Sequence, residues 1–252
     1  VKRIQDEFQK TPDLIIKEIK LSLFDTIYVV FLETVSSGNK VNDYILKNLS
    51  SFSSFKNTRK IDINSLIPGP NTKEIKNLDE IEYFITNGFT IVIRDNTVLG
   101  IETRADINRG IPTPDTEPAP NGPKDAFTEN YQINLGLIKK RLKSNKLKTE
   151  EFTIGRKTLT KVGLLYFADI AEDKTIQLVI DKLNKIDIDG ILDSSMIGQL
   201  ITKEDKTHFP TYVITERPDF VSKALLEGKI VIMVDTSPFA IILPAFFIDF
   251  IN

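Results

Sequence analysis

Residues 75–101 read IKNLDEIEYFITNGFTIVIRDNTVLGI, and residues 215–241 read TERPDFVSKALLEGKIVIMVDTSPFAI. A shift of 140 positions (215 − 75) aligns most of their apolar positions and three further pairs: Asp79 with Asp219, Gly88 with Gly228, and Asp95 with Asp235. Each stretch predicts a helix that ends at the glycine, followed by a strand, a tight turn and a second strand. Such self-similarity indicates a duplicated supersecondary unit.

The duplication extends towards the N-terminus of each stretch. Short strands are predicted at 14–20 and 147–154, continuous apolar strands at 26–32 and 162–167, and helices at 41–49 and 175–186. Continuous apolar runs are typical of strands that are covered on both faces. We therefore predict an α/β fold with two similar subdomains, each a small mixed sheet packed with helices.

A proline-rich stretch lies between the two copies. Residues 111–123 read IPTPDTEPAPNGP, with five prolines in thirteen positions. Proline fixes φ and lacks an N–H donor, so the stretch is typical of a semi-rigid linker. The predicted organisation is an N-terminal subdomain at 1–110, a linker at 111–123 and a C-terminal subdomain at 124–252.

A long helix is predicted directly after the linker. Gly122 and Pro123 would open it, and the basic residues within 139–143 would close it. One face carries an apolar stripe at helical spacing: Phe127, Tyr131, Leu135, Ile138 and Leu142. Core packing is the favoured interpretation of this stripe, and a partner-helix interface is the alternative. The counterpart in the first copy would be 1–10, with Ile4 and Phe8 on one side.

Composition excludes several classes of site. The net charge of −2 gives no overall attraction to nucleic acid. The chain has no cysteine, which rules out disulfides and thiolate ligands, and His208 is its one histidine. The longest apolar run, 238–248, is shorter than the roughly 20 residues of a membrane helix. We expect no cofactor, no metal site and no nucleic-acid partner.

The run 186–193 contains a cluster of aspartates. Asp187 and Asp189 could bind a hard cation through oxygen ligands, but the spacing to the following glycine is not that of an EF-hand. A helix end followed by a turn is the favoured interpretation. Asp193 or Ser194 would then cap the next helix, predicted at 196–201.

Three further residues are candidates for a ligand-binding or interdomain site. Glu216 and Arg217 precede the last helix and could contact a ligand, bridge the subdomain boundary or simply form the helix-entry loop. Asp235 follows an apolar strand, where a catalytic aspartate could lie, but its counterpart Asp95 favours a turn residue. No P-loop or dinucleotide fingerprint is present. The enzymatic alternative is a metal-dependent phosphate-handling protein that uses Asp235 and Asp189.

A resemblance to a known family runs through the second half. The matching residues are Asn121-Gly122-Pro123, Phe127, Asn134, Ile138, Arg141-Leu142-Lys143, Thr160-Lys161-Val162, Tyr166, the run 186–194, Phe209-Pro210, Thr215-Glu216-Arg217-Pro218-Asp219, the run 225–229, Asp235-Thr236-Ser237-Pro238-Phe239-Ala240 and Pro244. In this order they resemble the A subunit of the spore germinant receptors of Bacilli and Clostridia, the GerA family. Residues 1–120 match this subunit in layout alone.

The resemblance implies a hydrophilic region that precedes a bundle of membrane helices, beginning after residues 249–252. It also implies partners, a membrane B subunit and a lipoprotein C subunit, and a location at the spore inner membrane with this domain on the cytoplasmic, core-facing side. Together the subunits sense nutrients and trigger germination.

The resulting hypothesis is a non-enzymatic receptor domain. A hinge at 103–123 would let the two subdomains reorient, and a small-molecule germinant in the cleft between them would favour one arrangement. Its candidate contacts are Asp187, Asp189, Glu216, Arg217 and Asp235, and none of them is assigned as catalytic. In the alternative, the domain only assembles subunits or self-associates, and the ligand binds elsewhere.

Overall fold

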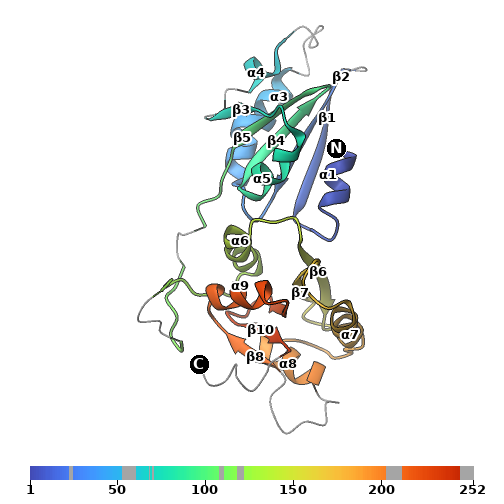
Figure 1. The fold of residues 1–252 in the computed structure, drawn as a ribbon, viewed down its shortest axis with the longest axis vertical. Coiled ribbons are helices and arrows are strands. Elements are labelled where there is room, and N and C mark those ends of the chain that lie inside the picture. The colour runs from blue at the N-terminus through green and yellow to red at the C-terminus, as the bar shows by residue number, and fades with distance from the viewer. Residues whose placement is uncertain are drawn as a thin grey trace. The chain divides into compact units, whose positions relative to one another are not determined.

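The computed structural model describes residues 1–22, 25–52, 61–67, 69, 71–107, 111–117, 122–202 and 212–244. The chain forms two compact units, drawn in Figure 1. Unit 1 comprises Val1–Gln9, Asp13–Ile107 and Lys143–Asn145, and unit 2 comprises Lys10–Pro12, Asn108–Leu142 and Lys146–Asn252.

Unit 1 contains a five-stranded sheet in the order β1-β2-β4-β5-β3. Its strands are β1 (Leu14–Ser22), β2 (Asp25–Leu32), β3 (Thr72–Glu74), β4 (Phe89–Arg94) and β5 (Thr97–Glu102). Its helical segments are α1 (Lys2–Glu7), α2 (Gly38–Val41), the π-helical η1 (Asn42–Leu46), α3 (Lys47–Phe52), α4 (Ile63–Leu66), the 3₁₀ turn η3 (Leu78–Glu80) and α5 (Ile81–Thr86).

Unit 2 repeats this topology in its own five-stranded sheet, in the order β6-β7-β9-β10-β8. The strands are β6 (Leu147–Ile154), β7 (Thr160–Phe167), β8 (Val213–Thr215), β9 (Ile230–Val234) and β10 (Ala240–Leu243). The helices are α6 (Tyr131–Arg141), α7 (Asp173–Asn184), α8 (Ser194–Thr202) and α9 (Pro218–Leu226). The equivalent strand orders confirm two similar α/β subdomains (Figure 1).

The sheets are antiparallel rather than mixed, which corrects one detail of the predicted fold. Every pair of named strands runs antiparallel in both units. The continuous apolar runs in β2 and β7 indicate strands that are buried on both faces, which is usual for parallel strands and led to the prediction of mixed sheets. Here the hairpins β1–β2 and β6–β7 fix antiparallel neighbours, and helices cover both faces of the sheet instead.

Alternation along β2 divides the core of unit 1 into two layers. Ile27, Val29 and Phe31 pack with the layer that includes α2, η1, α3 and α4. Val30 and Leu32 point to the opposite layer, which includes α1 and α5. Burial of such a side chain contributes about 1.5–3 kcal/mol, so the period of two determines which helix covers which face. Ile4 and Phe8 are buried in the second layer, as the sequence predicts.

In unit 2 the apolar face of β7 packs on α7 and α8, through a core that includes Val162, Leu164 and Ile197. On the α6 side, α9 contacts β7, β9 and β10, and α6 packs on α9. The predicted stripe from Phe127 to Leu142 is buried throughout, which confirms core packing for it.

The start of α6 differs from the prediction. The helix begins at Tyr131 rather than at 122–123, because the Asn130 side chain accepts a hydrogen bond from the backbone N–H of Ile133 (3.0 Å). Asn130 is therefore the N-cap, and the preceding Pro123–Glu129 is not helical. Within the described ranges, no helix combines the length and apolar character needed to cross a bilayer.

Candidate functional site

The described part of the linker is fastened to unit 2 by Glu216. This side chain is 6% exposed, and its Oε1 accepts hydrogen bonds from Thr116 N (2.6 Å), Thr116 Oγ1 (2.7 Å) and Glu117 N (3.0 Å). The backbone carbonyl of Glu216 accepts a further bond from Phe127 N (2.8 Å). Residues 111–117 belong structurally to unit 2, within the stretch where the sequence predicts a semi-rigid linker.

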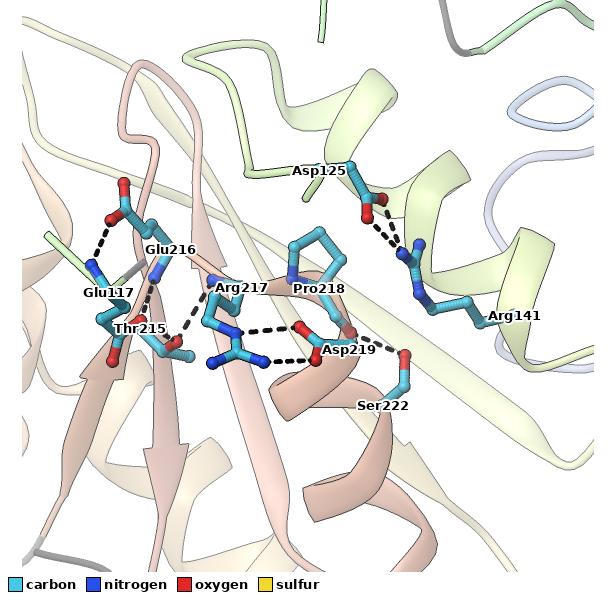
Figure 2. Close-up of polar contacts among 9 residues, drawn as sticks. All are labelled: Glu117, Asp125, Arg141, Thr215, Glu216, Arg217, Pro218, Asp219 and Ser222. Atoms are coloured by element: carbon cyan, nitrogen blue, oxygen red, sulfur yellow. Dashed lines mark hydrogen bonds and ion pairs between the residues drawn. The ribbon is translucent and has the colours of Figure 1, made fainter. Parts of the chain in front are cut away.

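Glu117 completes the attachment from the linker side. Its Oε2 accepts from Thr215 Oγ1 (2.5 Å) and from Glu216 N (3.3 Å), as Figure 2 shows. Thr215 is itself buried and is held in register opposite Ala240 of β10. We call the four residues Thr116, Glu117, Thr215 and Glu216 the linker clasp. Its two carboxylates each bind the backbone of the opposite segment, which holds the segments together at two points.

The clasp stabilises the ionised form of Glu216. Burial raises the pKa of this carboxyl, but hydrogen bonds from Thr116 and Glu117 outweigh burial, and the net pKa is lowered. Backbone N–H and hydroxyl donors therefore stabilise the negative charge. A carboxylate of this kind is a structural anchor at neutral pH, since its Oε1 accepts three hydrogen bonds from its own chain.

Arg217 points to a different partner. Its guanidinium forms a two-point pair with Asp219, with Nε–Oδ1 at 3.1 Å and Nη2–Oδ2 at 2.6 Å (Figure 2). Burial raises the pKa of Asp219, and the Arg217 hydrogen bonds lower it by more. Arg217 is also the N-cap residue of α9, with Pro218 in the first turn. The pair therefore stabilises the start of α9 next to the clasp.

Asp187 and Asp189 lie on a loop, and both side chains are exposed. Arg156 contacts both of them, at 3.4 Å from Asp187 and 2.9 Å from Asp189, and Lys157 lies 3.0 Å from Asp189. Asp193 caps α8, as the sequence predicts, by accepting from Met196 N (3.2 Å). Among the described residues, no group of three or more His, Cys, Asp or Glu could hold a metal ion.

Asp235 binds the first turn of α6. Its Oδ1 accepts from Tyr131 N (3.2 Å), and the next residue, Thr236, donates its N–H to Glu129 O (2.9 Å). In the equivalent turn of unit 1, Asp95 itself is in the left-handed region (φ 50°). In unit 2 the left-handed residue is Thr236 (φ 68°), one position after Asp235. Asp235 therefore binds the backbone of α6, and Asp189 pairs with Arg156 and Lys157. The structure gives no support to the alternative of an enzyme that uses Asp235 and Asp189.

Some polar contacts were not predicted from the sequence. Asp125 binds Nη2 of Arg141 through both carboxylate oxygens, each at 2.6 Å (Figure 2). Both residues lie within the range that the sequence predicts as one long helix after the linker. The Glu117 contacts were not predicted because the surrounding prolines indicate a semi-rigid linker and do not show which residues would bind it. His208 lies outside the described residues.

These features define a class of protein: a duplicated α/β module with a linker segment bound to its second unit. The family model described as "Bacillus/Clostridium GerA spore germination protein" matches residues 2–252. The chain belongs to the GerA family of spore germination proteins. The match includes the first half, where the sequence showed a resemblance in layout alone.

Individual relatives agree with this family. The chain is 34% identical over 250 residues to spore germination protein KA of Bacillus subtilis, covering 97% of this chain and 46% of the relative. It is 32% identical over 260 residues to GerQA of Bacillus cereus, covering 100% of this chain and 51% of the relative. The chain therefore spans about half the length of these curated relatives.

A solved structure is also similar. It is the N-terminal domain of the A subunit of the Bacillus megaterium spore germinant receptor GerK3, with a TM-score of 0.72 and 30% sequence identity. The similarity covers 98% of this chain and 93% of that domain. The predicted resemblance to a germinant-receptor A subunit is thereby confirmed, together with the two-subdomain α/β fold.

Proposed function

We propose that this chain is the N-terminal, non-enzymatic domain of a spore germinant receptor A subunit, and that it transmits the germination signal. The observation that carries the proposal is the similarity to the GerK3 A-subunit domain over nearly the whole chain. Because the curated relatives are about twice as long, the remainder of the protein would supply the membrane part.

The proposed transmission depends on how the linker is attached. In unit 1, Thr103 O accepts from Ser37 N (2.7 Å), and Ala105 N donates to Val35 O (2.9 Å). In unit 2, the linker clasp fixes Thr116 and Glu117. The reorientation proposed for 103–123 would then leave Thr103 and Ala105 attached to unit 1, and Thr116 and Glu117 attached to unit 2. Because the clasp holds the linker segment on unit 2, a movement of that segment would also move unit 2.

The partners in this proposal are the B and C subunits of the receptor, at the spore inner membrane, with this domain on the core-facing side. Self-association and binding of a small-molecule germinant are the additional roles proposed from the sequence. Assembly without sensing is the second candidate function. The relatives KA and GerQA are named as spore germination proteins. Their names support a role in germination, whether the domain transmits the signal or only assembles subunits.

The experiment removes the coding region for residues 1–244 from the full-length gene and compares spores with and without it. Signal transmission predicts that germination with the cognate nutrient is lost while the B and C subunits remain in the inner membrane. An assembly role predicts that the B and C subunits are lost as well. Normal germination without this region, with the truncated protein present in spores, would contradict both.

Ligand binding by the domain is tested separately by a melting-temperature titration of the 252-residue chain with amino acids, sugars, nucleosides and inorganic ions. A ligand present at 100 times its Kd stabilises a folded protein by about 2.7 kcal/mol. A saturable shift with one compound class would support sensing by this domain. A flat response would leave transmission or assembly as its function.

A further inference from the structure

Unit 2 contains an apolar cavity at α7, α8 and the end of β10, which Figure 1 labels. It measures about 230 Å³, and most of its surface is apolar. Its aliphatic lining residues are Leu178, Val179, Ile201, Leu243 and Pro244. An apolar cavity of about 150 Å³ is large enough to bind benzene. This cavity can therefore hold one aromatic ring. Among the described residues that line it, none belongs to the linker clasp.

The polar groups at the cavity already have partners. Thr175 Oγ1 donates to Glu172 Oε2 (2.8 Å), and Thr202 Oγ1 donates to Gly198 O (2.8 Å). Lys182 also lines the cavity and is likewise engaged in the structure. An occupant would therefore gain from burial of its apolar surface rather than from hydrogen bonds or charge.

The chain itself carries an apolar segment next to this cavity. The described part of unit 2 ends at Pro244, and Pro244 lines the cavity. Residues 245–248, beyond the described part, read AFFI. A chain advances at most about 3.3–3.6 Å per residue, so Phe246 and Phe247 begin within roughly 11 Å of Pro244. Because consecutive side chains point in different directions, one of the two rings can face the cavity whichever way the chain turns.

We propose that the segment 245–248 docks in this cavity, with the ring of Phe246 or Phe247 inside it. Leu178 of α7, which is 54% exposed in the described structure, packs against the same segment. The loop from Pro244 is only a few residues long, so docking costs less entropy than the binding of a separate molecule. The docked segment holds the chain that follows β10 against unit 2. The docking does not depend on the proposed germination function.

The test measures nuclear Overhauser contacts between phenylalanine rings and methyl groups in the 252-residue chain. We expect contacts from the ring of Phe246 or Phe247 to the methyl groups of Val179 and Ile201. The double variant Phe246→Ala/Phe247→Ala should shift these methyl signals and lower the melting temperature by roughly 3 °C or more. The control Phe250→Ala removes a ring from the same stretch and should change neither. Absence of contacts from both rings, or equal effects of the control, would overturn the proposal.

A second pair of variants changes the cavity instead of the segment. Leu178→Gln places a polar group at the cavity, and glutamine favours a helix about as well as leucine does. It should weaken the ring contacts. The control Leu226→Gln replaces a leucine of nearly equal exposure, 56% against 54%, at the end of α9 and outside the lining. It should leave the contacts unchanged, and equal effects of the two variants would contradict docking at this cavity.

Benzene distinguishes this segment from other occupants. The docked ring excludes benzene from the wild-type chain, so its Kd should be at least roughly tenfold lower for Phe246→Ala/Phe247→Ala. Saturable shifts of the Val179 and Ile201 methyl signals measure the Kd. Equal affinity for both chains would show a cavity open to a separate apolar ligand and would overturn the proposal. Methyl shifts of the wild-type chain that change with protein concentration would assign the cavity to a second copy and would overturn it as well.

Discussion

Glu117 and Glu216 bind each other's backbone. Oε1 of Glu216 accepts from the N–H of Glu117 (3.0 Å), and Oε2 of Glu117 accepts from the N–H of Glu216 (3.3 Å). Because both carboxylates bind amide donors, they stabilise the attachment rather than oppose each other as two like charges. This reciprocal contact joins residues 99 positions apart in the sequence and fixes the linker segment to β8.

Replacement of Glu216 by alanine should open the clasp locally. The amides of Thr116 and Glu117 lose their acceptor, so their hydrogen exchange should become markedly faster. The amide of Phe127 is an internal control, because it donates to the backbone carbonyl of Glu216, which the substitution retains. Exchange measured by NMR checks this. Unchanged exchange at Thr116 and Glu117 would show that the carboxylate does not hold the linker.

The clasp should also give a specific pH dependence of stability. The pKa of Glu216 in the folded protein is below its usual value of 4.5, so its stabilisation is fully present above that value and is lost as pH falls through the folded pKa. Glu216→Gln should remove this contribution, so the difference in unfolding free energy between the two proteins should shrink below about pH 4. Urea denaturation at several pH values measures it. A difference that grows towards acid pH would contradict the assignment.

The buried ion pair in unit 1 should matter more than any exposed one. Arg94 binds Asp25 at two points, with Nη2–Oδ2 at 2.7 Å, and the side chains are 6% and 1% exposed. Asp25→Ala removes the carboxylate that faces a buried guanidinium, which keeps Ile61 O (2.8 Å) as an acceptor, and should cost about 3–5 kcal/mol. The control Asp43→Ala breaks an exposed pair with Lys47 and should cost about 0.5 kcal/mol or less. Similar losses of unfolding free energy for both variants would contradict this distinction.

The two helix-ending glycines should differ in their tolerance of a side chain. Both Gly88 (φ 78°) and Gly228 (φ 81°) lie in the left-handed region, where alanine costs roughly 1 kcal/mol. A Cβ at Gly88 would lie 2.6 Å from Val35 O, a backbone atom that cannot move alone, whereas at Gly228 the nearest atom is Ile170 Cγ2 at 3.1 Å. Gly88→Ala should therefore lower the melting temperature more than Gly228→Ala. The reverse order would refute the steric argument.

Local patterns in the sequence predicted the repeated framework well. The equivalent glycines, the apolar strands and the Asp193 cap all depend on interactions between near neighbours, so a single sequence contains the signal. The start of α6 was misplaced because Gly122-Pro123 is a strong opening signal in isolation. The structure instead uses Asn130, whose cap is reinforced by Asp235 from a distant turn.

There is a physical reason why the sequence does not predict the linker clasp. Its bonds join Thr116 and Glu117 to a segment about 100 residues away, and nothing in the proline-rich stretch indicates where its carboxylate would dock. The sequence predicts Glu216 and Arg217 as site residues, but the structure gives them separate partners. The sequence predicts Asp187 and Asp189 from their charge density, and in the structure they form exposed pairs with Arg156 and Lys157.

The central claim is that the linker clasp transmits the signal in a germinant receptor A subunit. The most direct measurement is the germination rate of spores that carry the full-length protein with Glu216→Ala, compared with wild type and with the exposed control Glu227→Ala at the end of α9. At equal receptor levels, the account predicts a severalfold slower response for Glu216→Ala and a wild-type response for Glu227→Ala. A wild-type response from Glu216→Ala spores, with the clasp shown to be open by hydrogen exchange, would contradict it.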